Sequence, residues 1–240
     1  MKQRAFDYLG QNRLANIDML EMLQLPDVRV VLAGGSGVLL EHDSLFALAC
    51  EPGCGTRFLP LLTQGADASD ERMIVLHGAE LLDALTQDCG FTTIMDCRNA
   101  AYLLDTPVPY VLPQGAQIRP LDTGHVEFVH AHYRTVDDIG YIRERIEAGM
   151  FGVFVRGEPA GFCGTHDERS MGLLEILPDY RRLGLGYCLE AYLINHLLAL
   201  GRVPFCQIAI QNTASLRLQQ KLGLTLAPAV IHWLGRKQTH

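Results

Sequence analysis

The feature that most constrains the fold is a nine-residue stretch from Pro178 to Gly186, "PDYRRLGLG", between two apolar runs. The preceding run, "MGLLEIL", is short enough for a strand, and the following run, "YCLEAYLINHLLALG", is long enough for a helix. Glycine lets the backbone approach a ligand closely, and the first turn of a helix has unpaired N–H groups with partial positive charge. The stretch therefore predicts a strand, a glycine turn and a helix whose start can bind a phosphate group.

The leucines of the second run define one face of the predicted helix. Residues Leu185, Leu189, Leu193, Leu197 and Leu200 recur at helical spacing. We expect a helix from about Gly184 to Leu200 with this leucine face in a hydrophobic core.

Composition limits the class of protein and its partners. The chain has 240 residues, 48% of them hydrophobic and 20% charged, with a formal net charge of −7, which is typical of a globular protein with one or two cores. No cluster of lysine and arginine is present to bind nucleic acid, and no apolar stretch is long enough to span a membrane. The first twenty residues predict an amphipathic helix rather than a signal peptide, and seven scattered cysteines indicate reduced thiols. We expect a cytoplasmic protein with no nucleic-acid or membrane partner.

A proline-rich segment divides the chain into two predicted halves. Prolines at positions 107, 109, 113 and 120 interrupt the periodicity, which places the boundary near residue 113 and gives domains 1–112 and 113–240. In the first half, "VRVVLAGGSGVLLEHDSLFALAC" predicts successive strands, and "RMIVLHG" before "AELLDALTQDCGF" predicts a strand and then a helix. The "GGSG" at 34–37 has no P-loop lysine and no following helix, so it predicts a hairpin turn. This half is α+β or α/β.

The second half alternates strands and helices. Its expected strands are "AQIRPL", "FGVFVRG", "EPAGFCGTH", "MGLLEIL", "PFCQIAI" and "LAPAVIHWL". Its expected helices are "HVEFVHAHY", "DDIGYIRERIEAG", the leucine-faced helix and "TASLRLQQKLG".

Two motifs in this half resemble those of the GNAT acyltransferase superfamily. Arg181-x-x-Gly184-x-Gly186, after a strand and opening a helix, looks like its acyl-CoA loop. "QNTASLRLQQKLGL" resembles its later Asn-x-x-Ser helix ending in Leu-Gly-Phe, with Leu224 in place of phenylalanine. The resemblance covers residues 115–240 and is nearest to the glycine N-acyltransferase-like branch. It implies an α/β (α+β) GNAT fold with a mixed central sheet flanked by helices. In that branch a degenerate N-terminal copy of the fold often precedes the catalytic half, which is one interpretation of residues 1–112.

The predicted coenzyme site follows from the loop and from the resemblance. Backbone N–H groups from Arg182 to Gly186 can converge on a pyrophosphate, and a guanidinium from Arg181 or Arg182 adds charge-assisted hydrogen bonds. The candidate coenzyme-binding residues are Ile176, Leu177, Arg181, Arg182, Leu183, Gly184, Leu185, Gly186, Asn212, Ser215 and Gln219. The resemblance implies acetyl-CoA or another acyl-CoA as co-substrate and no metal.

The resemblance also implies roles for residues outside the loop. The backbone of Ile176 and Leu177 would polarise the thioester, and Asn212 and Ser215 would contact the pantetheine and cap their helix. Gln219 stands where the family often has a tyrosine that protonates the leaving thiolate, and an amide cannot supply that proton.

The general base is predicted among four side chains. Glu175 comes first, because burial in an apolar strand would raise its pKa toward a useful range. The alternative is that strand alternation directs Glu175 to solvent or into a salt bridge. His166, Asp167 and Glu168, at the turn before the strand, are the other candidates, with a plain solvated turn as the alternative. The position that carries the expected carboxylate in the family is Ser170 here.

Two functions remain open from the sequence. The first is direct acyl transfer from a thioester to a primary amine of a small molecule or amino acid, by a monomer or homodimer. The second is a catalytically decayed coenzyme-A-binding module that acts as a sensor or interaction domain. His125, His130 and His132 lie in one predicted helix, but His130 and His132 are two residues apart and face different sides, so no metal site is expected.

Overall fold

The computed structural model describes residues 1–64 and 72–236. These residues form two compact units, one comprising Met1–Ala101, Gln207–Leu216 and the chain from Thr225 onward, the other comprising Tyr102–Cys206 and Arg217–Leu224. We call them the first and the second unit. Each unit is made of segments that are distant in sequence. A single boundary near residue 113 therefore does not coincide with the division into these two units.

The first unit is built on a large mixed sheet with helices on both faces. Its strands are β1 (Arg29–Gly34), β2 (Gly37–His42), β3 (Leu45–Cys50), β4 (Met73–His77), β5 (Phe91–Ala101), β11 (Thr225–Leu226) and β12 (Ile231–Arg236). Its helical segments are α1 (Lys2–Leu9), η1 (Gly10–Asn12), α2 (Ile17–Met22), η2 (Gly55–Arg57), α3 (Leu59–Thr63) and η3 (Ala84–Asp88). The strand order is β1-β2-β3-β4-β12-β5-β10, where β10 is Phe205–Ala209 and β11 pairs with β5.

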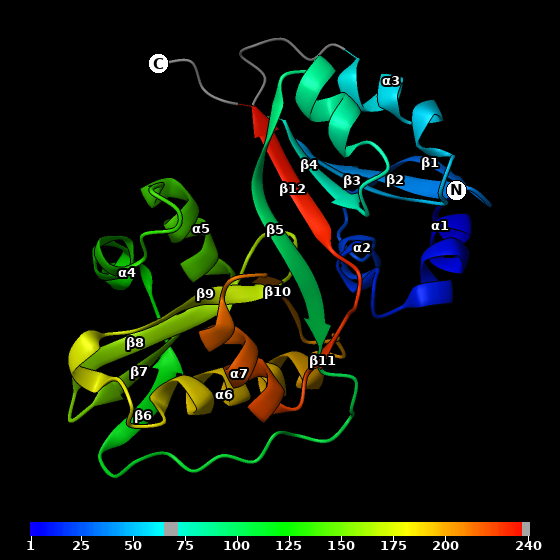
Figure 1. Ribbon diagram of the computed structural model, residues 1–240. Helices are drawn as coiled ribbons and strands as arrows, with labels where there is room; N and C mark the ends of the chain where they lie inside the picture. Colours follow the sequence, from blue (N-terminus) through cyan, green and yellow to red (C-terminus); the bar gives the residue numbers. More distant parts are fainter. Residues whose placement is uncertain (65–71, 237–240) are drawn as a thin grey trace. The chain divides into compact units, whose positions relative to one another are not determined.

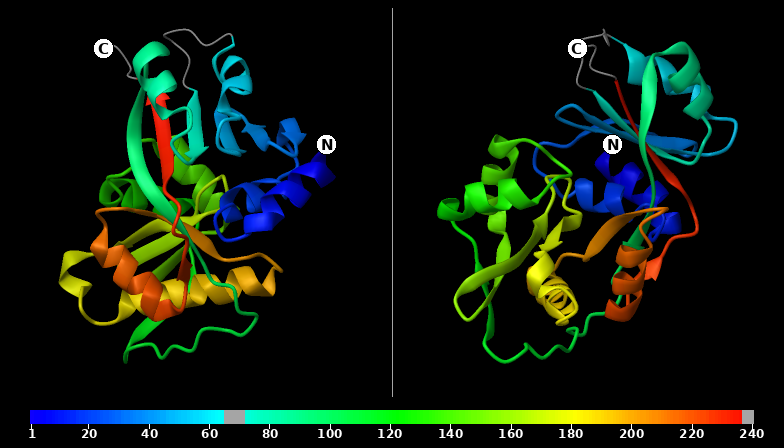
Figure 2. Two further views of the ribbon diagram at one scale, coloured as in Figure 1. Left: turned by 45° about the vertical axis from the view of Figure 1, so that its right-hand side comes forward. Right: turned by 60° about the vertical axis from the view of Figure 1, so that its left-hand side comes forward.

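The register of this sheet decides which side chains face which helices. β3 and β4 run parallel, with Ala49 opposite His77, whereas β12 pairs antiparallel with both β4 and β5. Alternation along β4 puts Ile74 and Leu76 in the core under α3 and η3, and Val75 in the core under α1 and α2. Figure 2 shows these two helical layers on opposite faces of the sheet.

The hairpin prediction for "GGSG" is confirmed. β1 and β2 are antiparallel and close with Gly34 opposite Gly37. Gly37 has φ +151°, and a Cβ there would lie 2.7 Å from Cys50 Cβ, so the close approach of β3 requires glycine at this position.

The second unit is built on an antiparallel sheet with the strand order β6-β7-β8-β9. Its strands are β6 (Ala116–Pro120), β7 (Phe151–Val155), β8 (Glu158–Thr165) and β9 (Met171–Ile176). Its helical segments are η4 (Thr123–His125), α4 (Val126–His132), α5 (Ile139–Gly149), η5 (Pro178–Tyr180) and α6 (Leu185–Ala199). Helix α7 (Thr213–Leu222) follows β10. Figure 1 shows α4 and α5 on one face of this sheet and α6 on the other.

Apolar side chains are buried on both faces of this sheet. Phe154 and Phe162 pack with apolar residues of α4 and α5 in one core. On the other face, Leu185, Leu189, Leu193 and Leu197 of α6 are at most 2% exposed, as predicted. Leu200 is 59% exposed, because α6 ends at Ala199 and the residue lies beyond the leucine face. The prediction of a core position was wrong for Leu200 alone.

Candidate active site

The predicted phosphate loop joins β9 to α6 through backbone conformations that favour glycine. Gly184 is the residue before the helix and has φ +79°, and Arg182 has φ +64°. Helix α6 has no side-chain cap. The N–H groups of residues 182–187 have no hydrogen-bond acceptor among the residues that the structure describes, and the first helical bond starts at Cys188, which donates to the Gly184 carbonyl (3.2 Å). These consecutive unpaired donors at a helix start suit an anion.

Space is open where a ligand would approach these donors. A Cβ built on Gly184 would meet no atom within 4 Å, and one on Gly186 would be 3.5 Å from the nearest Ile176 side-chain atom. Leu183 is 52% exposed, whereas Leu185 is buried in the core. Because its side chain is buried, Leu185 can contact a ligand in the loop only through its backbone.

The two arginines differ in what they contact. Arg181 donates from Nε to the Ile176 carbonyl (2.9 Å) and from Nη2 to Glu175 Oε1 (3.0 Å), so it ties the loop to the end of β9. Arg182 is exposed and makes no hydrogen bond or ion pair within the described part of the chain. Arg182 therefore has the guanidinium that is available to a phosphate.

Glu175 forms a salt bridge with Arg181, which is one of the two alternatives predicted from the sequence. Its side chain is 31% exposed and pairs with Arg181, so the burial expected for a perturbed base is not found. The Leu177 N–H donates to the Ala160 carbonyl (2.9 Å) and already has an acceptor. The prediction that a backbone N–H polarises the thioester therefore now applies to Ile176 and not to Leu177.

The turn before β9 is a cluster of titratable groups rather than a plain solvated turn. The Ser170 hydroxyl donates to Glu168, and the Tyr141 hydroxyl of α5 is 2.7 Å from His166 Nδ1. Burial raises the pKa of Glu168 to about 8, although the Ser170 hydrogen bond acts in the opposite direction. Burial lowers the pKa of His166 and raises that of Tyr141. Burial also acts to raise the pKa of Asp167, but its hydrogen bonds and the nearby positive charge outweigh that effect and lower it.

Two residues of this cluster were not singled out from the sequence. Tyr141 lies 25 residues before its partner His166, so no local pattern could show the contact. A Cβ on Gly172 would clash with the His166 imidazole, so glycine there allows the ring to pack against β9. The apolar–glycine pattern at the start of "MGLLEIL" was the available signal for a close approach.

A β-bulge interrupts β9 beside this cluster. The register shifts between Phe162 and Gly164 of β8, and Leu173 has φ +50°, a strained conformation for leucine. Leu173 is 1% exposed, so packing holds it there. Bulges of this kind interrupt pairing and re-aim side chains, and they occur often near active sites.

The residues of the second motif have separate roles. Asn212 Oδ1 accepts from the Ser215 N–H (3.0 Å), which confirms the predicted helix cap of α7. Gln219 is 3% exposed, and its Nε2 donates to both carboxylate oxygens of Glu190 in α6 (2.8 and 2.9 Å). Burial raises the pKa of Glu190 to about 7, with the Gln219 amide acting the other way. The amide nitrogen of Gln219 is thus occupied by a carboxylate rather than directed to a coenzyme.

Tyr192 of α6 is half-buried and packs edge-to-face with Phe151 (ring centroids 4.9 Å apart). Among residues 1–64 and 72–236, no group of three or more metal-ligating side chains comes together. Over the same residues, no helix has the length and apolar character to cross a membrane.

The comparisons with known proteins agree with the loop and the fold. Residues 150–234, which include β9, the glycine loop and the Asn212 motif, match the FR47-like protein family. No curated protein sequence gives a significant match.

Several solved structures align with most or all of the chain. A Drosophila protein has a TM-score of 0.77 at 17% identity, with 100% of this chain and 96% of that chain covered. A GCN5-related N-acetyltransferase from Kribbella flavida has a TM-score of 0.62 at 19% identity, with 93% and 95% covered. A tandem GNAT protein from the clavulanic acid biosynthesis pathway has a TM-score of 0.57 at 14% identity, with 100% and 95% covered.

The fold is therefore similar to that of these GNAT proteins, and the similarity to a tandem GNAT protein fits a two-half architecture. Together with the FR47-like match, this confirms the predicted resemblance to GNAT acyl-CoA N-acyltransferases. The glycine N-acyltransferase-like branch receives no specific support.

Proposed function

We propose that the protein is an acyl-CoA-dependent N-acyltransferase that transfers an acyl group, in the first place acetyl, directly from the thioester to a primary amine. The observation that carries this proposal is the run of unpaired N–H groups at residues 182–187, at a helix start opened by Gly184. These groups would bind the coenzyme pyrophosphate, and Arg182 would add a charge-assisted contact. A cytoplasmic location and a small-molecule or amino-acid acceptor belong to the same proposal.

The reaction requires the protein to position the amine beside the thioester and to accept one proton. The amine nitrogen forms a bond to the thioester carbonyl carbon, the carbon–sulfur bond breaks, and the thiolate leaves with coenzyme A. A base must take the proton that the ammonium loses. We assign this role to Glu168, because burial raises its pKa to about 8 and the Ser170 hydroxyl donates a hydrogen bond to its carboxylate.

One observation favours the second function, a coenzyme-binding module without turnover. Gln219 replaces the family's expected acid and is bonded to Glu190. A thiolate is a good leaving group, so the missing acid weakens the enzyme proposal less than a missing nucleophile would. The two functions differ in one measurement: both bind acyl-CoA, and only the first releases free thiol when a suitable amine is present.

Calorimetric titration with acetyl-CoA tests the binding site. Gly184→Asp should abolish binding, because it adds a side chain and a negative charge where the pyrophosphate would sit. Gly157→Asp is the matched control, since Gly157 also has a positive φ (+94°) and open space but lies in the β7–β8 turn. Equal affinity for the folded Gly184→Asp variant and for the control would contradict the proposed site. A thiol-release screen against small amines then tests transfer itself.

A further inference from the structure

Several polar side chains are buried in the first unit, and the proposed acyl transfer uses none of them. Asn16, Asp18 and Glu21 of the α2 region are each at most 8% exposed, and Asn99 of β5 is fully buried. Such groups are uncommon in hydrophobic cores, because burying a polar group costs free energy unless it is hydrogen-bonded. Their grouping under one helix points to a site.

Asp18 is the centre of this polar network. Its carboxylate accepts from His77 Nε2 (2.9 Å), Asn99 Nδ2 (2.8 Å) and Gln207 Nε2 (3.2 Å). Within the described part of the chain, no lysine or arginine bonds to Asp18. The contact with Asp18 orients the His77 ring and leaves Nδ1 as its second polar atom.

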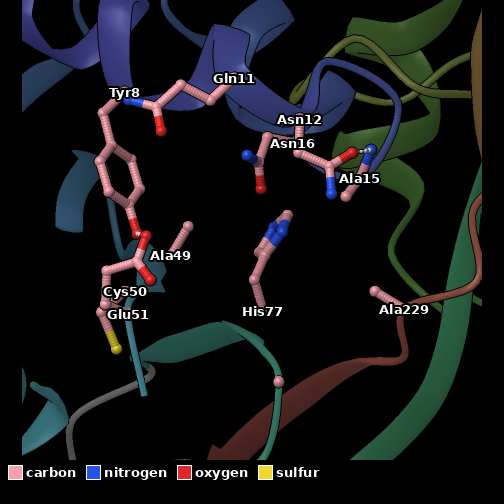
Figure 3. A pocket seen from close by; sticks show the side chains of 11 residues that line it. Tyr8, Gln11, Asn12, Ala15, Asn16, Ala49, Cys50, Glu51, His77 and Ala229 are labelled. Atoms are coloured by element: carbon pink, nitrogen blue, oxygen red, sulfur yellow. Dashed lines mark hydrogen bonds between the residues drawn. The ribbon is translucent and has the colours of Figure 1, made fainter. Parts of the chain in front are cut away.

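His77 lies at the edge of a pocket of about 310 Å³. One side of this pocket is formed by the carboxyl ends of the parallel strands β3 and β4, with Ala49, Glu51 and His77. The other side is formed by the segment from α1 to α2, with Tyr8, Asn12 and Asn16. Figure 3 shows these side chains around a common space. The volume is at the lower end of the range of about 300–1,000 Å³ that is usual for small-molecule sites.

The polar atoms in this pocket have a definite pattern. Asn12 Oδ1 accepts from the Ala15 N–H (3.4 Å), which leaves its amide nitrogen as a donor. Asn16 Nδ2 donates to the Leu9 carbonyl (3.1 Å), which leaves its amide oxygen as an acceptor. The Tyr8 hydroxyl donates to Glu51 (3.4 Å) at the rim, and burial raises the pKa of Tyr8 to about 12, so it keeps its proton.

The charge of the pocket is negative. Glu51 lines it, Asp18 lies behind His77, and no lysine or arginine is among the lining residues. An anion would be repelled by the Glu51 carboxylate, whereas an ammonium group would be attracted to it. The donor left on Asn12 suits a neutral acceptor on the same ligand.

We propose that this pocket binds a small primary ammonium compound that also carries an amide or hydroxyl group. The ammonium would bond to Glu51 and to the Asn16 amide oxygen, and the neutral group would bond to Asn12 and His77. Asp18 is a positioning residue that orients His77. The site lies within the first unit and does not depend on the proposed acyl transfer.

Saturation-transfer NMR with glycinamide as the probe tests this site in the full chain. Glycinamide should bind the wild type, whereas acetamide, which lacks the ammonium, and acetate, which is an anion, should bind at least tenfold more weakly. Glu51→Gln should raise the Kd for glycinamide about tenfold or more, because it removes the charge and keeps the size of the side chain. Asp7→Asn is the matched control on the exposed face of α1 and should leave the Kd unchanged.

Three results would overturn the proposal. They are no saturation of glycinamide by the wild type, an equal Kd for wild type and Glu51→Gln, and tighter binding of acetate than of glycinamide. Glycinamide bound at the proposed acyl-acceptor site would be insensitive to Glu51→Gln, so it would give the second result and not the expected one. Asn12→Ala provides an independent variant at an exposed position and should also weaken binding, with circular dichroism melting to confirm that each variant folds.

Discussion

Replacing the buried Glu190 with glutamine should make the stability of the protein less dependent on pH. Glu190 is 3% exposed in the middle of α6, and its pKa is raised from 4.5 to about 7. The folded state therefore holds a proton on this carboxyl between pH 4.5 and 7, whereas the unfolded state releases it. Binding of the proton to the folded state stabilises the fold at low pH, and this stabilisation is lost as the pH rises through 7.

The expected magnitude follows from the size of the shift. Each unit of pKa difference corresponds to about 1.4 kcal/mol, so a shift of roughly two to three units gives about 3 kcal/mol between pH 4.5 and pH 8. Glutamine keeps the shape of the side chain and carries no charge at any pH. The free energy of unfolding of Glu190→Gln should therefore be close to that of the wild type at pH 4.5 and higher by up to about 3 kcal/mol at pH 8.

Urea unfolding at a series of pH values measures this difference directly. The wild-type curve contains every other titrating group, and the difference between wild type and variant isolates Glu190. Glu158→Gln, at an exposed position of β8, is the control for replacing a carboxylate by an amide outside the core. A constant difference for Glu190→Gln as well would show that this carboxyl is not held buried against Gln219, and the reasoning would fail.

Two further predictions concern the second unit and α7. If Glu168 is the base, the wild-type rate of acyl transfer should rise as the pH passes about 8, and Glu168→Gln should remove this rise and lower the rate by about 10²–10⁴-fold, as measured by thiol release over a pH series. The same profile for Glu175→Gln tests the sequence-based choice of base, and a loss confined to Glu175→Gln would reverse the assignment. Asn212→Ala should lower the free energy of unfolding by about 1 kcal/mol, because it removes the cap of α7, and an unchanged urea midpoint would contradict that role.

The sequence by itself determined the local elements and the glycine loop before the leucine-faced helix. Glycine and arginine at the start of a leucine-faced helix are short-range signals, because a helix start needs only its own N–H groups and a residue that tolerates positive φ. The same holds for the "GGSG" hairpin and for the Asn212 cap, whose partners lie within a few residues. These predictions needed no knowledge of the rest of the chain.

The tertiary structure alone decided which strands share a sheet and which side chains meet. Alternation along "LAPAVIHWL" predicts a strand but not its neighbours, and the structure inserts β12 between β4 and β5. The sequence left open whether Glu175 is buried or forms a salt bridge, and the structure shows a half-buried Glu175 paired with Arg181. The contacts of Asp18 with His77, Asn99 and Gln207 join residues 59, 81 and 189 positions apart. Such contacts depend on sheet register and helix placement, which no periodicity of the sequence encodes.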